Sequence, residues 1–143
     1  MIDDIILNKI ETIKRCIDRI NEEYVGFEDE FYQNYTKQDS IILNLERLSQ
    51  ATIDISTHII RVEEFGIPKT SREVFVLLEQ NRVLSKDISY SMQKMVGFRN
   101  LAVHDYQNLN LDIVVAIITN HLKDFEKFVK EVQNGNDNRS KQR

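Results

Sequence analysis

The chain has 143 residues, a length that suits one domain with its own hydrophobic core. Hydrophobic residues make up 41% and charged residues 29%, and four glycines with one proline leave few turns for a sheet. The formal net charge of −4 argues against tight, sequence-independent binding to nucleic acid, because basic residues drive such binding.

The N-terminal residues have the wrong charge for a secretory signal, since Asp3 and Asp4 precede the first apolar run. No later run is long enough to span a membrane. Cys16 is the single cysteine, so it cannot form an internal disulfide, and no Cys/His spacing suggests a metal site. We therefore expect a protein of the reducing cytoplasm that holds no metal and no cofactor.

The first half of the chain predicts two long helices. Apolar residues alternately four and three positions apart predict an amphipathic helix that ends at Gly26; they are Ile6, Ile10, Ile13, Ile17, Ile20 and Tyr24. The acidic and aromatic stretch 27–36 is predicted to be a connector or a short extra helix. Asp39 is predicted to be the N-cap of a second long helix, which repeats the same spacing and stops at Gly66, just before Pro68.

Three further helices are predicted in the second half. Thr70 and Glu73 have the spacing of a capping box and open a short helix that ends at Asn81. Ser85 starts a fourth helix, whose apolar stripe leads directly to the charged residue Arg99. A final long helix is predicted over about 111–132, because the same apolar spacing returns there.

These elements predict an all-α protein, an antiparallel bundle of about five helices. We expect a single domain over residues 1–133, followed by a disordered polar tail over 134–143. His121 falls on the apolar stripe of the last helix and is predicted to be structural. His58 is predicted to be a helix-surface histidine or a core histidine with a satisfied hydrogen bond.

The segment 98–106 gathers three side chains that suit phosphate chemistry. The guanidinium of Arg99 can hold a phosphate, the imidazole of His104 titrates near neutral pH, and Tyr106 offers a hydroxyl. On a continuous helix, Arg99 and His104 would lie about 140° apart. Either the helix breaks between them, or two copies of the segment meet across a two-fold axis. We favour a helix end near Val103, because polar residues follow soon afterwards.

Arg99-Asn100 followed by His104 and Tyr106 resembles the R-x4-H-x-Y signature of HepT toxins, members of the HEPN ribonuclease superfamily. The resemblance covers roughly residues 4–130. Its other matching features are the Asp54 and His58 pair with Ile59, the stop at Gly66-Ile67-Pro68, the opening Ser71-Arg72-Glu73 and the approach Met95-Val96-Gly97-Phe98. One departure is Asn81, which stands where the family often has glycine.

The resemblance implies a homodimeric, metal-independent endoribonuclease in which Arg99 and His104 are the catalytic pair and Asn100 supports them. It also implies an MntA-like nucleotidyltransferase antitoxin that transfers AMP to Tyr106 and so blocks the cleft of the dimer. We expect the 2′-hydroxyl of the RNA to attack the adjacent phosphate, with proton transfer by His104 and charge stabilisation by Arg99. The expected products are a 2′,3′-cyclic phosphate and a 5′-hydroxyl.

A different class of function fits the same residues. Without the resemblance, an Arg and His pair at a helix end is more often a surface or capping arrangement than a catalytic site. The alternative is a non-catalytic helical subunit that binds a nucleotide or a nucleotidyltransferase. Arg99 would then only hold a phosphate.

Overall fold

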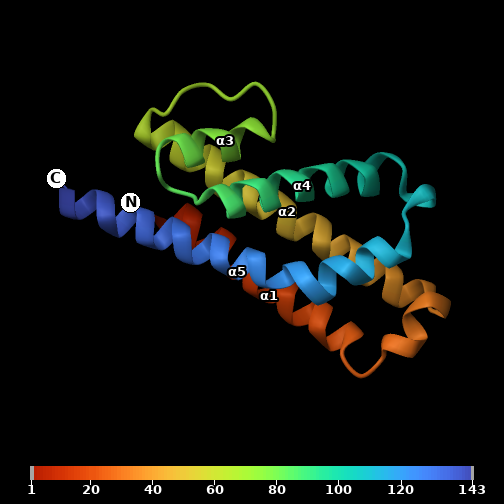
Figure 1. The fold of residues 1–143 in the computed structure, drawn as a ribbon. Coiled ribbons are helices and arrows are strands. Elements are labelled where there is room, and N and C mark those ends of the chain that lie inside the picture. The colour runs from red at the N-terminus through yellow and green to blue at the C-terminus, as the bar shows by residue number, and fades with distance from the viewer. Residues whose placement is uncertain (1, 143) are drawn as a thin grey trace.

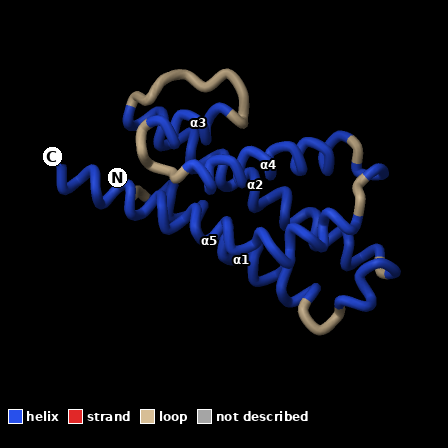
Figure 2. The backbone as a smooth tube through the Cα atoms, viewed as in Figure 1, coloured by secondary structure: helices blue, strands red, loops and turns tan. Residues whose placement is uncertain are grey.

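Five α-helices and two short 3-10 helices form the fold in this computed structural model, which describes the backbone of residues 2–142 and the side chains of residues 2–135. In chain order the elements are α1 (Asp4–Tyr24), η1 (Glu28–Gln33), α2 (Tyr35–Glu63), α3 (Glu73–Gln80), α4 (Lys86–His104), η2 (Tyr106–Asn108) and α5 (Leu111–Gln142). Figure 2 shows no strand in the described backbone. The predicted all-α class is confirmed.

Helix α2 lies at the centre of an up-and-down bundle and contacts all four other α-helices (Figure 1). Its buried face is apolar, and several small polar side chains on it bond to backbone carbonyls. The hydroxyl of Ser49 donates to the carbonyl of Met95 over 3.3 Å and fixes α4 against α2. The hydroxyl of Ser89 donates to the carbonyl of Phe75 over 3.2 Å and ties α4 to α3. The helix that carries the candidate site is therefore held on two sides.

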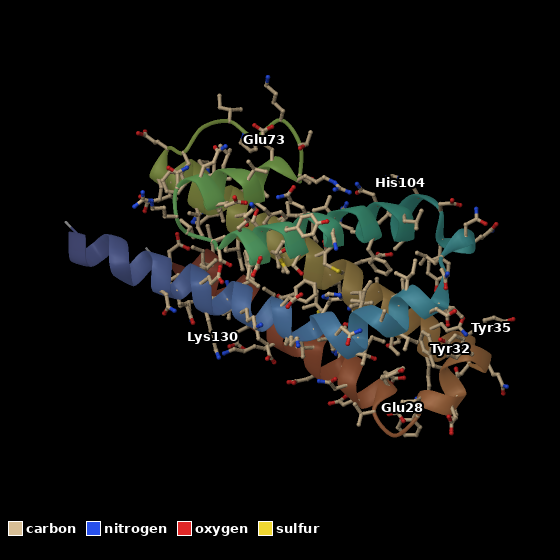
Figure 3. All side chains as sticks on the ribbon, in the orientation of Figure 1. Glu28, Tyr32, Tyr35, Glu73, His104 and Lys130 are labelled. Carbon is tan, nitrogen blue, oxygen red and sulfur yellow. The ribbon has the colours of Figure 1, made fainter. Side chains whose placement is uncertain are left out.

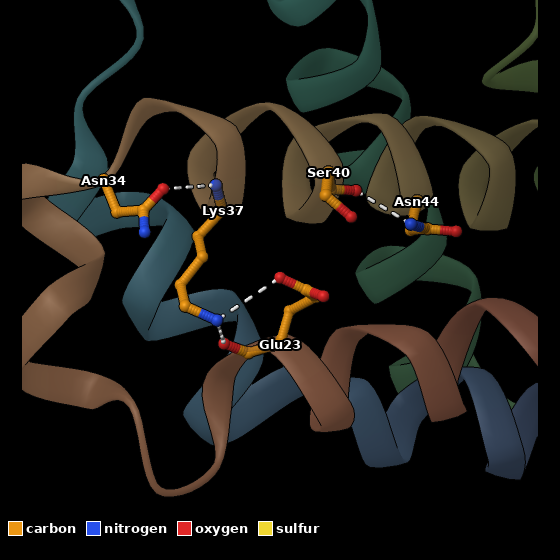
Figure 4. A network of polar contacts seen from close by, with 5 residues as sticks. All are labelled: Glu23, Asn34, Lys37, Ser40 and Asn44. Carbon is orange, nitrogen blue, oxygen red and sulfur yellow. Dashed lines mark hydrogen bonds and ion pairs between the residues drawn. The ribbon is translucent and has the colours of Figure 1, made fainter.

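The start of α2 corrects one prediction. The helix begins at Tyr35, where the side chain of Asn34 accepts a hydrogen bond of 3.0 Å from the backbone N–H of Lys37 (Figure 4). Asp39 therefore lies inside the first turns of α2, and its prediction as the N-cap was wrong. The ammonium of Lys37 also bonds to Glu23 near the end of α1, at 3.2 Å to its carbonyl and 3.4 Å to its carboxylate.

The predicted boundaries at Gly26, Asn81 and Ser85 agree with the structure. At Gly26 the backbone has a φ of 87°, a conformation that glycine adopts without strain, directly after α1. The predicted capping box forms only in part: the hydroxyl of Thr70 accepts the N–H of Glu73 at 3.2 Å, but the carboxylate of Glu73 accepts the N–H of Lys69 at 3.1 Å, and α3 begins at Glu73 with Arg72 as its N-cap. Asn81 is the C-cap of α3, and Ser85 caps α4 by accepting the N–H of Ile88 at 3.3 Å.

Two histidine predictions have different outcomes. His58 is buried and bonded on both ring nitrogens, so the prediction of a satisfied core histidine is confirmed. His121 is exposed and bonds to Asp124, so its prediction as a core residue was wrong. Its neighbour Leu122, whose side chain is purely apolar, is the residue that is buried in the core at this point of α5.

The C-terminal prediction is not decided by the described residues. The backbone of α5 continues to Gln142, while the side chains of residues 136–143 lie outside the described ones. A disordered tail over 134–143 stays a prediction, as does the single domain over 1–133. None of the described helices is long and apolar enough to cross a membrane.

Candidate active site

The segment with the Arg, His and Tyr residues lies at the outer end of α4 and in the turn η2 that follows (Figure 1). Helix α4 runs without interruption through His104, and the N–H of Asp105 donates to the carbonyl of Leu101 over 2.7 Å to close its last turn. A helix break between Arg99 and His104 is therefore excluded. The predicted end near Val103 is correct within one residue.

The continuous helix separates the two candidate catalytic residues. Five helical positions place Arg99 and His104 about 140° apart around the axis and about 7.5 Å apart along it. Arg99 is half-buried at the end of the stripe that faces α2, whereas His104 is exposed, as Figure 3 shows at the outer end of α4. No hydrogen bond joins the two side chains in the described part of the chain. Instead Arg99 donates to the side-chain oxygen of Asn100 over 3.3 Å.

Tyr106 is hydrogen-bonded to Asp39, the residue that the sequence had wrongly predicted to be a helix cap. Its hydroxyl donates a hydrogen bond to the carboxylate of Asp39 in α2, across 67 positions of the chain. Burial raises the pKa of the Tyr106 phenol far above its usual value, and the hydrogen bond and charge of Asp39, with the charge of Glu46, add to this effect. The side chain is still 41% exposed, so a second molecule can reach it.

Arg72, the residue before α3 that also belongs to the sequence resemblance, brings a further positive charge against α4. The guanidinium of Arg72 rests against Gly97, where a Cβ atom would lie only 2.7 Å from its Nη2. Gly97 and His104 are seven positions apart, which places them on nearly the same side of the helix, two turns from each other. Arg72 therefore adds a positive charge to the face of α4 that presents His104.

An apolar cleft of about 380 Å³ runs between α4 and α5 beside the candidate residues. Its lining includes Met95, Phe98, Leu101, Ile113, Ile117 and His121. Leu101 is 41% exposed and Ile113 is 51% exposed, so large apolar side chains meet solvent here. Such a patch next to polar residues is typical of a protein interface.

The Asp54 and His58 pair of the sequence resemblance lies away from this site and joins the N-terminal segment to α2. Asp54 receives the amide of Gln50 at 2.8 Å and the ammonium of Lys9 at 3.0 Å. His58 bonds to Asp3 at 2.5 Å, and Arg61 donates to its other ring nitrogen at 3.1 Å. These residues stabilise the bundle. Among the side chains of residues 2–135, no group of three or more His, Cys, Asp or Glu residues could hold a metal ion.

Comparison with known proteins gives a consistent result. The family model for HepT-like ribonucleases matches residues 10–132. The mRNA nuclease HepT of Shewanella oneidensis is 53% identical over 131 residues, which are 92% of this chain and 98% of the relative. The tRNA nuclease HepT of Aphanizomenon flos-aquae is 26% identical over 129 residues, 90% of this chain and 87% of the relative.

Solved structures of similar proteins show the same fold. The tri-AMPylated Shewanella oneidensis HEPN toxin in complex with the MNT antitoxin superimposes with a TM-score of 0.89 at 53% identity. The alignment covers 93% of this chain and 99% of that one. A toxin-antitoxin structure with AMP-PNP has a TM-score of 0.89 at 52% identity and covers 92% of this chain and 99% of that one.

Proposed function

The chain belongs to the HepT-like ribonuclease family, and we propose that Arg99 and His104 are the residues with which it cleaves RNA. The observation that carries the proposal is their place at the solvent-exposed end of α4, in a chain that matches the family over almost its whole length. A guanidinium offers two parallel donors to a phosphate, and an imidazole can take up and release a proton near neutral pH. Asn100, bonded to Arg99, supports the orientation of the guanidinium.

The working form in this proposal is a symmetric dimer. Within one chain, the continuous helix directs Arg99 and His104 to different sides of α4, so one copy alone does not surround a phosphate. A two-fold axis beside α4 would bring two copies of the segment into one groove. The apolar cleft with its exposed Leu101 and Ile113 supports a partner on this side of the helix.

The proposed reaction is an attack of the substrate's 2′-hydroxyl on the adjacent phosphorus. His104 accepts the proton of the attacking hydroxyl and gives it to the leaving 5′-oxygen, while Arg99 stabilises the negative charge of the transition state. The products are a 2′,3′-cyclic phosphate and a 5′-hydroxyl, and no step calls for a metal ion. We infer that the protein acts in the cytoplasm, where its proposed RNA substrate is found.

The direct test is cleavage of RNA by the purified chain in the presence of EDTA. Arg99→Ala and His104→Ala should each abolish cleavage without changing the melting temperature by more than a few degrees. Arg19→Ala, an exposed arginine of α1, is the matched control and should cleave normally. Full activity of either site variant contradicts the catalytic pair. A wild-type chain that binds RNA without cutting it would favour the non-catalytic subunit instead.

The regulatory part of the proposal is AMPylation of Tyr106 by a nucleotidyltransferase antitoxin of the MntA type. The similar Shewanella oneidensis toxin is tri-AMPylated and bound to its MNT antitoxin, and Tyr106 is the exposed tyrosine of the signature. Added AMP would bring bulk and negative charge beside His104 and so exclude the phosphates of RNA. Intact mass after incubation with the antitoxin and Mg-ATP should increase in steps of one AMP, and Tyr106→Phe should remain unmodified.

A further inference from the structure

The contact between Tyr106 and Asp39 joins two distant parts of the chain at the atom that the proposed modification would use. Tyr106 lies in η2, whereas Asp39 lies in α2, and the phenolic O–H points at the carboxylate. Asp39 is not in the signature that the sequence resembles, and no helix cap needs it, because Asn34 caps α2. Among the described side chains, this carboxylate accepts a hydrogen bond from Tyr106.

We propose that Asp39 is the general base for AMP transfer to Tyr106, a role that rests on the modification proposed above. The nucleotidyltransferase supplies ATP with its magnesium, and this chain supplies both the nucleophile and the group that takes its proton. The toxin would thus contribute a catalytic residue to its own inactivation.

The step balances with these groups. The phenolic oxygen of Tyr106 forms a bond to the α-phosphorus of ATP, and its proton passes along the existing hydrogen bond to the carboxylate of Asp39. The bond from the α-phosphorus to the oxygen that bridges to the β-phosphorus breaks, and pyrophosphate leaves with that electron pair. The products are Tyr106 linked to AMP through a phosphodiester bond, pyrophosphate and a protonated Asp39.

A base is needed because the free phenolate is disfavoured at this position. Burial raises the pKa of Tyr106, and the negative charges of Asp39 and Glu46 raise it further. The hydroxyl therefore attacks as a neutral group and must lose its proton while the new bond forms. An aspartate that accepts the proton of an attacking hydroxyl performs the same task in protein kinases.

The fold offers a matched control for this pair. The hydroxyl of Tyr32 in η1 donates to the carboxylate of Asp112 at the start of α5, over 2.5 Å. Tyr32 is 49% exposed, which is similar to Tyr106. The chemistry of the two pairs is the same, but Asp112 is bonded to a tyrosine outside the signature.

The test is the rate of AMP addition to the full-length chain by the MNT antitoxin of Shewanella oneidensis with Mg-ATP, followed by intact mass. Asp39→Asn retains an oxygen that accepts the hydrogen bond of Tyr106 but is not basic, so the rate should fall by roughly 10²- to 10⁴-fold. Asp39→Ala should be equally slow, and Asp112→Asn should react at the wild-type rate. Melting temperature and co-purification with the antitoxin verify that each variant is folded and binds.

The outcomes separate this role from the modification itself. If Asp39→Asn reacts at the wild-type rate while Asp39→Ala is slow, Asp39 only positions the tyrosine, and its role as the base is refuted. If all variants react equally, Asp39 has no role. If the Shewanella oneidensis toxin is modified in the same assay but this wild-type chain is not, the proposed regulation fails together with the role of Asp39.

Discussion

The guanidinium of Arg72 lies against the backbone of α4 at Gly97, in a space that only glycine leaves open. A Cβ atom at this position would lie 2.7 Å from Nη2 and 3.8 Å from Cζ of Arg72. Two turns further along the same side of α4 is the exposed imidazole of His104. An arginine in this position can neutralise a phosphate next to the one that the proposed pair of Arg99 and His104 would cleave.

We expect Arg72→Ala to weaken RNA binding uniformly across sequences, because the contact is with phosphate and not with a base. The dissociation constant should rise several-fold, and the slope of log K against log salt should decrease by about 0.7 for one lost phosphate contact on single-stranded RNA. Fluorescence anisotropy over a salt series measures the dissociation constant and the salt slope, in the His104→Ala background, which we expect not to cleave the RNA. An unchanged salt slope would show that Arg72 does not contact the substrate.

Gly97→Ala tests the same contact from the other side. Alanine is more favourable than glycine inside a helix by about 1 kcal/mol, so the variant should be folded and no less stable. The new methyl group must displace the tip of Arg72, because the conflict is with the end of a flexible side chain. RNA affinity should therefore fall as in Arg72→Ala, while the melting temperature is kept. Loss of stability with unchanged affinity would contradict this interpretation.

The hydrogen bonds of the Asp3 carboxylate predict that the stability of the fold depends on pH. Its carboxylate accepts hydrogen bonds from His58 and from the N–H of Ile6, and these bonds lower its pKa below the ordinary 3.8. Because the folded pKa lies below the unfolded one, the stabilisation is present above pH 3.8 and is lost as the pH falls through the folded value. Since the side chain is 40% exposed, solvent limits the effect to about 1 kcal/mol or less.

The measurement is urea unfolding of the wild type and of Asp3→Asn at pH 7 and near pH 3. Asparagine keeps an oxygen for the helix cap but not the charge. The variant should be less stable than the wild type at pH 7, and the two should converge at low pH. Asp4→Asn is the neighbouring control. A difference between wild type and Asp3→Asn that stays constant with pH would contradict the assignment.

The proposed dimer can be tested on the apolar cleft. Ile113→Lys places a charge in the patch between α4 and α5 and should shift the protein to a monomer without unfolding it, because the side chain is 51% exposed in the single chain. RNA cleavage should fall in parallel if the groove is shared by two copies. Ile67→Lys, at an 87% exposed loop position, should change neither property. Sedimentation velocity and the cleavage assay provide the readouts.

Local signals in the sequence predicted the helix boundaries well. Ser85 places a side-chain oxygen three residues before an N–H that needs an acceptor, so this cap depends only on near neighbours. The prediction of Asp39 as a cap failed because the stretch 27–36 has no clear apolar spacing, so it gave no sign that α2 already starts after Asn34. His121 and Leu122 are adjacent positions on one stripe, and only packing decides which of them is buried.

Helical periodicity predicted how the candidate residues lie relative to one another, but the sequence did not predict their tertiary contacts. The separation of Arg99 and His104 follows from helical periodicity, and the structure excluded the alternative of a helix break between them. The partners Asp39 and Arg72 were not predictable, because each reaches the site from a different element through a tertiary contact. No local spacing encodes such contacts.

Tyr106→Phe should keep the ability to cleave RNA but lose the neutralisation that depends on AMPylation. The variant keeps the aromatic ring but loses both the nucleophile and the hydrogen bond to Asp39, which costs about 0.5–1.5 kcal/mol at most. Because Tyr106 takes no part in the proposed cleavage step, the purified variant should still cut RNA. Co-expression with the antitoxin should then rescue growth of cells with the wild-type chain but not of cells with Tyr106→Phe. Rescue of both would show that binding alone neutralises the toxin, whereas rescue of the wild type alone assigns neutralisation to the modified hydroxyl.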